Sequence, residues 1–277
     1  MSIEWSLVFF TLFSGLAAGV FTGIAVSEWT GGGAKQVRFP GAVLTLAALV
    51  IGGGSSVLHL GHPERIFGAL KQPGSSIFFE ALLIGLFGLI VIFYLLALRR
   101  GASALVTRLL ATLGAIPAVL LACTVGSTYM MPSRPAWDTL ILPVLYLASA
   151  GVMGCFGIAA LLSGRDESPA VPALSKITLM FLGIQAVLTA AYLVYLSVAP
   201  YPDVSRSAAR VLIGDLAPIF WGGLVILGLL VPGFILLRVE KPGLLTKARY
   251  GLMCVLVAGI VFRAMMFSLG SAIHEFF

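Results

Sequence analysis

The chain has 277 residues, of which 60% are hydrophobic and only 10% are charged, with a formal net charge of +6. Soluble domains carry roughly 25% charged and about 45–50% apolar residues, so this composition excludes a soluble globular protein, a nucleic-acid-binding module and a disordered chain. The mean hydropathy of +1.08 indicates an integral membrane protein.

Eight apolar runs are long enough to cross a membrane, since a hydrocarbon core needs about 20 apolar residues per helix. We expect these spans near residues 6–26, 40–58, 76–98, 109–129, 139–162, 174–199, 216–237 and 250–270. Glycine, proline and arginine residues separate them. The predicted fold is an all-α, polytopic bundle of eight transmembrane helices that forms a single membrane domain over residues 1–277.

Positive charge is distributed unevenly between the two sides of such a bundle. Eleven of the 17 lysines and arginines lie on the side that follows the odd-numbered spans. Because cytoplasmic loops carry the excess of positive charge, we expect that side to face the cytoplasm and both termini to lie outside. Glu28 and Lys176 fall at cytoplasmic helix ends, where we expect interfacial anchors.

Two groups of glycines occur in the first two spans. Gly15, Gly19 and Gly23 recur at every fourth residue, which is the spacing of close helix packing in membranes. The run at residues 52–54 is followed by two serines and allows either close packing or room for a ligand against the backbone. The sequence alone leaves both interpretations of the second group open.

Ionisable residues within membrane spans are costly and mark candidate functional sites. His59 ends the second span, and Arg65 lies in the loop that follows it. Glu80 lies about one turn inside the third span, which returns from that loop. Arg263 is fourteen residues beyond Arg249, about 21 Å along a helix, so it also falls in the outer half. The sequence therefore predicts a polar pocket near the outer leaflet.

Each of these residues also has a purely structural interpretation. His59 can cap a helix, Glu80 can form an ion pair with Lys71 or Arg263, and Arg65 can lie at headgroup level with its stem along apolar surface. Three further polar residues are expected to be solvated at the outer surface: His62, Glu64 and His274.

Neither a metal site nor a haem chain is indicated. The three cysteines lie inside apolar runs and form no metal-binding spacing. Haems that carry electrons across a bilayer need axial ligands, usually histidines, at both leaflets. All three histidines lie toward the outer side, which excludes such a chain and leaves only a single outer haem on His59 and His274 as an alternative.

Three loop segments resemble a known family. Residues 58–67 (LHLGHPERIF), 74–80 (GSSIFFE) and 132–137 (PSRPAW) are similar to loops of the membrane-anchor subunits of dimethyl sulfoxide reductases, and the Pro-Glu-Arg triplet resembles the related polysulfide reductase membrane subunits. The resemblance implies a subunit of a bacterial or archaeal cell membrane that anchors a molybdopterin catalytic subunit and an iron–sulfur subunit. It also implies electron exchange with menaquinone or ubiquinone, with no haem in this chain.

By the same resemblance, His59 and Arg65 are quinone-site residues and Glu80 is the acidic residue that begins the third span. Oxidation of a quinol releases two electrons and two protons, and the residues suit this chemistry. His59, with an ordinary pKa near 6.5, can accept one proton and Glu80 the other, while Arg65 or Arg263 polarises an oxygen. The apolar ring and tail would lie against residues of the loop and of the second span: Phe67 and Gly54.

Two other functions are consistent with the sequence. A proton- or ion-coupled secondary transporter could use Glu80 and Arg263, although paired broken helices in two matching halves are lacking. A non-catalytic membrane scaffold would need neither residue. Co-purification with an iron–sulfur protein and binding of quinone analogues would distinguish these alternatives from the quinone-binding anchor.

Overall fold

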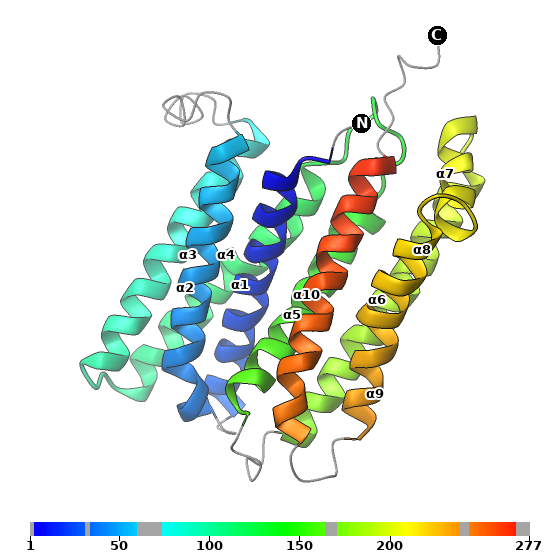
Figure 1. Ribbon diagram of the computed structural model, residues 1–277. Coiled ribbons are helices and arrows are strands. Elements are labelled where there is room, and N and C mark those ends of the chain that lie inside the picture. Colours follow the sequence, from blue (N-terminus) through cyan, green and yellow to red (C-terminus); the bar gives the residue numbers. More distant parts are fainter. Residues whose placement is uncertain (1–2, 31–33, 60–73, 164–170, 239–243, 270–277) are drawn as a thin grey trace.

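The computed structural model describes residues 3–30, 34–59, 74–163, 171–238 and 244–269, and within these ranges it is helical without strands (Figure 1). The elements follow in the order α1 (Trp5–Thr30), α2 (Ala34–His59), α3 (Ser76–Arg99), α4 (Ala104–Ser127), α5 (Ile141–Leu161), α6 (Val171–Val198), α7 (Pro202–Leu212), α8 (Ala217–Ile219), the π-helical η2 (Phe220–Leu230), α9 (Val231–Leu237) and α10 (Leu244–Leu269).

Eight helical segments among the described residues are long and apolar enough to cross a membrane, which confirms the predicted number. Seven of them are single helices, and the eighth is the continuous run of α8, η2 and α9 over Ala217–Leu237. The predicted ends agree with the structure within a few residues, since apolar run length decides them. The short helix α7 was not predicted, because it lies outside the spans.

The two ends of the bundle can be named from its topology. We call the end at which α1 begins and α10 finishes the terminal end, and the other the opposite end (Figure 1). Which of them faces the cytoplasm stays a prediction from the charge distribution. α1 and α5 occupy the centre: 67% of each span is buried, against 17% for α3. α1 packs against α2, α4, α5 and α10.

The glycine ridge on α1 is the contact surface for α5. A Cβ atom added at Gly19 would overlap the carbonyl oxygen of Ala150, and one added at Gly154 would overlap the backbone of Gly19. Gly15 lies against Met153 one turn away. The prediction that this spacing serves helix packing is confirmed, because the two backbones approach closely enough to exclude any side chain.

At the opposite end, Glu28 joins four helices through a buried cluster. Its side chain is fully buried, and the carboxylate accepts hydrogen bonds of 2.6 Å from Arg38 on α2 and 2.6 Å from Tyr94 on α3. Arg108 on α4 donates to the Glu28 carbonyl oxygen at 3.0 Å. The expectation of an interfacial anchor is therefore wrong for Glu28: the carboxylate is paired inside the bundle, because two donors from neighbouring helices converge on it and a third holds its backbone carbonyl.

Candidate functional site

The structure describes three of the six predicted site residues in full. Glu80 and Arg263 are placed with their side chains and Gly54 with its backbone, whereas for His59 only its position as the last residue of α2 is described. The other predicted or weighed positions lie outside the described residues: Arg65, Phe67, His62, Glu64, Lys71 and His274. All three residues placed in full belong to the half of the bundle nearer the terminal end, as the span count predicts.

Glu80 is the fifth residue of α3, and its position follows from the start of that helix. Ser75 caps α3 by accepting a hydrogen bond from the Phe78 N–H at 3.2 Å, which is the usual role of serine before a helix. One turn into the helix, the Glu80 side chain points inward and is only 8% exposed. Its partner is Thr128, at the end of α4, whose hydroxyl donates to Glu80 Oε1 at 2.7 Å.

The Thr128 hydroxyl can serve Glu80 in either protonation state. It also lies 2.9 Å from the Thr124 carbonyl oxygen, and its single proton cannot go to both acceptors. When Glu80 is ionised, Thr128 donates to the carboxylate. When Glu80 is protonated, the carboxyl O–H can donate to Thr128, which in turn donates to Thr124. The pair can therefore gain and lose a proton while the hydrogen bond between Glu80 and Thr128 is kept.

Arg263 is fully buried and does not pair with Glu80. Its Nε donates to Thr11 Oγ1 at 2.8 Å, and its two terminal nitrogens donate to the carbonyl oxygens of Gly259 at 3.0 Å and Thr11 at 3.3 Å. The guanidinium carbon lies 4.8 Å from the centre of the Tyr146 ring, a cation–π distance. The proposed ion pair of Glu80 with Arg263 is therefore wrong, because groups of α1, α5 and α10 hold the arginine.

An aromatic cluster lies at the terminal end, beside both Glu80 and Arg263. Tyr129 directly follows Thr128, and its ring packs against those of Tyr146 at 6.2 Å, Trp137 at 5.7 Å and Phe267 at 5.5 Å between ring centres. The Trp137 indole also donates to the Met266 carbonyl oxygen at 2.9 Å, which ties the cluster to α10. This set of aromatic rings connects the Glu80 side of the bundle with the Arg263 side.

Burial raises the pKa of Tyr129 well above its ordinary value. The neighbouring Tyr146 and Glu80 act in the same direction, and only Arg263 opposes them. Tyr129 is therefore a neutral hydroxyl over the physiological pH range, and its chemical use would be as a hydrogen-bond partner for a ligand oxygen.

The loop segment 132–137 contributes Trp137 to this cluster and is held by α6. The Tyr195 hydroxyl donates to the Pro135 carbonyl oxygen at 2.6 Å, and the Tyr192 hydroxyl donates to that of Ala136 at 2.8 Å. The guanidinium of Arg134 lies 4.7 Å from the centre of the Trp137 ring. One of the three segments that carried the family resemblance thus connects α6 with the aromatic cluster.

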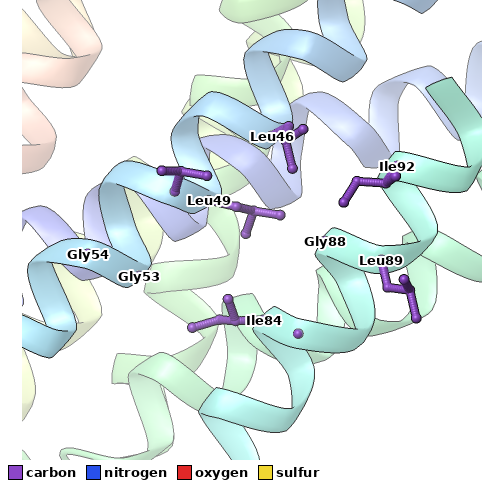
Figure 2. A pocket seen from close by; sticks show the side chains of 10 residues that line it. Leu46, Leu49, Gly53, Gly54, Ile84, Gly88, Leu89 and Ile92 are labelled. Carbon is purple, nitrogen blue, oxygen red and sulfur yellow. The ribbon is translucent and has the colours of Figure 1, made fainter. Parts of the chain in front are cut away.

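The glycines at residues 52–54 divide between two roles. Gly52 packs against α1, where an added Cβ would lie 3.2 Å from both the Phe10 carbonyl oxygen and the Ser14 hydroxyl. Gly53 and Gly54 instead line an apolar groove of about 400 Å³ between α2 and α3 (Figure 2). The two interpretations that the sequence left open are therefore both present, separated by one residue.

Sequence reasoning missed Thr128, Tyr129 and Tyr146. A signal existed, because all even-numbered spans finish at the same end of the bundle as His59. The polar residues that end the fourth span, Thr128 and Tyr129, therefore had to lie at the same end as Glu80. The partners of Arg263 carried no such signal, because Thr11 is an ordinary residue within an apolar run.

The comparison with known families covers nearly the whole chain. The profile of the family described as "Polysulphide reductase, NrfD" matches residues 1–273 and so includes all eight spans. The chain belongs to the NrfD family. This membership agrees with the resemblance to polysulfide reductase membrane subunits that the loop segments show. Among curated proteins, none matches the chain.

Proposed function

We propose that this NrfD-family chain is the quinone-binding membrane subunit of an iron–sulfur molybdoenzyme complex. In this role it anchors a molybdopterin catalytic subunit and an iron–sulfur subunit to the membrane, and it exchanges electrons between menaquinone or ubiquinone and the iron–sulfur partner. Family membership over residues 1–273 supports the anchor role. The observation that carries quinone binding is the buried carboxyl of Glu80, held by Thr128 beside the aromatic cluster.

The chemistry of the quinol couple suits these groups. Oxidation of a quinol to a quinone releases two electrons and two protons, and reduction takes up the same number. Glu80 can accept or supply one proton, because Thr128 satisfies it in both states. His59, at the end of α2, is proposed to accept or supply the other proton. The neutral Tyr129 hydroxyl is proposed to form a hydrogen bond with an oxygen of the quinone ring. The electrons pass to or from the iron–sulfur partner, which supplies the redox centre.

The transporter alternative is weakened by the contacts of Arg263. That alternative required Glu80 and Arg263 to act together along a substrate path. Each of the three guanidinium nitrogens has a partner in the bundle, and within the part of the chain that the structure describes no carboxylate forms an ion pair with it. Arg263 is thus better explained as a buried cation that joins α1, α5 and α10.

The test is a titration of the purified complex with a fluorescent quinol analogue, a hydroxyquinoline N-oxide. Wild type is expected to quench the fluorescence stoichiometrically, and Glu80→Gln, which cannot carry the charge, is expected to lose most of this binding. Asp203→Asn is the matched control, since it also neutralises a carboxylate at the terminal end, but one on α7 whose side chain is 42% exposed. An intact wild-type complex that binds no analogue would refute the proposal.

A further inference from the structure

The groove between α2 and α3 is apolar along its whole length. Its lining consists of six aliphatic residues and four glycines, which are Gly53 and Gly54 on α2 and Gly85 and Gly88 on α3. Figure 2 shows Leu49 of α2 and Ile84 of α3 on the two sides of the space between the helices. Because no lining side chain can form a hydrogen bond, the groove suits a hydrocarbon chain and no polar ligand. Its volume of about 400 Å³ falls within the roughly 300–1,000 Å³ of small-molecule sites.

The glycines of the groove are not required for helix packing. A Cβ added at Gly54 or Gly85 would meet nothing within 4 Å, and one added at Gly53 or Gly88 would only touch a side chain at 3.8 or 4.0 Å. This contrasts with Gly19, where the neighbouring backbone leaves no room for a side chain. A glycine inside a helix is less favourable than an alanine, because it loses more backbone freedom on folding. At these four positions closer helix packing does not offset that disadvantage. The absence of a side chain there keeps the groove open.

The groove begins close to the proposed quinone site. On α3, the lining residue of the groove nearest the terminal end is Ile84. It is four residues from Glu80, which is about 6 Å along the helix. On α2, Gly54 is five residues from His59, or about 7.5 Å. A molecule whose polar ring lies between these two helix ends would therefore direct an attached chain into the groove. Exposed lining residues, such as Val50 and Leu89, leave the side of the groove accessible.

We propose that this groove binds the isoprenoid tail of the quinone whose ring lies at the Glu80 end. The inference rests on the proposed function and deepens it, because it names the part of the substrate that the groove recognises and the route of entry. Since the groove is accessible from the side, the tail can enter laterally from the bilayer while the ring reaches the site, without separation of the central helices α1 and α5.

The experiment compares two probes that share a ring and differ in the tail: the 2-nonyl and 2-methyl forms of 4-hydroxyquinoline N-oxide. Each is titrated into the purified complex and followed by fluorescence quenching. We expect wild type to bind the nonyl probe about tenfold more tightly, which corresponds to about 1.4 kcal/mol. Gly85→Leu and Gly88→Leu fill the groove at two depths and should abolish this preference while leaving the affinity for the methyl probe unchanged.

Gly183→Leu is the matched control. Gly183 is an exposed glycine of α6 where an added Cβ would also meet nothing within 4 Å, and it lies outside the groove. This variant should retain the wild-type preference for the nonyl probe. The inference is overturned if both groove variants keep the preference, or if they weaken both probes equally. Wild type that binds neither probe would instead refute quinone binding itself, so the two failures are distinguishable.

Discussion

The buried cluster around Glu28 provides the sharpest test of the fold. Glu28→Gln preserves the shape of the side chain but removes its charge. The glutamine has one carbonyl oxygen for the two donors, Arg38 and Tyr94, that lie 2.6 Å from the carboxylate oxygens. Its NH₂ group faces one of these donors and cannot accept a hydrogen bond. The substitution therefore leaves the Arg38 cation without its counter-charge. When the amide oxygen faces Arg38, the Tyr94 hydroxyl loses its acceptor and can only accept from the NH₂ group instead.

The magnitude follows from the burial of the pair. Removal of one partner of a buried ion pair costs about 3–5 kcal/mol. The Glu28 side chain is 0% exposed but that of Arg38 is 20% exposed, so solvent compensates part of the loss and we expect about 2–4 kcal/mol. For a chain of this size that corresponds to a decrease in Tm of roughly 3–7 °C.

The assay is thermal unfolding of the detergent-solubilised protein, followed by tryptophan fluorescence. Asp203→Asn is the control, because its ion pair with Arg206 at 3.2 Å is between side chains that are 42% and 77% exposed. Such surface pairs contribute about 0–1 kcal/mol, so Tm should change by no more than about 2 °C. Equal, small shifts for the two variants would show that Glu28 is solvated and would contradict the packing of α1 to α4 at the opposite end.

Three further outcomes are expected. Thr128→Val should lower quinol oxidation by about tenfold or more, because Glu80 loses a charged hydrogen bond of about 1.5–3 kcal/mol, whereas Thr128→Ser should retain most activity in the same assay. Gly19→Leu should abolish the monodisperse peak in size-exclusion chromatography, since its side chain overlaps the backbone of α5. Arg210 lowers the pKa of Asp215 below the ordinary 3.8, so this pair stabilises the fold above that pH and less as pH falls through the lowered pKa. Thermal melts below about pH 4 should therefore show a smaller acid-induced loss of stability for Asp215→Asn than for wild type, and equal losses would contradict the contact.

The sequence predicted the number of spans and the half of the bundle that holds Glu80 and Arg263. Both follow from local chemistry: a chain in lipid must satisfy its backbone hydrogen bonds within each helix, so apolar run length determines the spans. The run ending at residue 26 in the prediction extends to Thr30 in α1 because the helix continues into the Glu28 cluster. Successive spans run in opposite directions, so the number of a span shows at which end of the bundle it begins. This placed the polar residues at one end.

Partners across helices could not be predicted, because they depend on how each helix is rotated. Glu28 looked like an interfacial residue at a helix end, yet the rotation of α1 turns it toward Arg38 and Tyr94. Arg263 was expected near Glu80, but α10 directs it toward α1 instead. The prediction of a quinone site with His59, Arg65, Phe67 and Glu80 stays untested.

The composition of the sequence indicated a membrane protein, its apolar runs predicted eight spans, and the glycine spacing on α1 predicted a close packing surface. Only the tertiary structure decided which neighbour each surface meets. Gly52 packs against α1, while the adjacent Gly53 and Gly54 line an open groove. A helix turns about 100° per residue, so consecutive glycines face different neighbours. The distance and tilt of those neighbours then determine whether a glycine allows contact or leaves space.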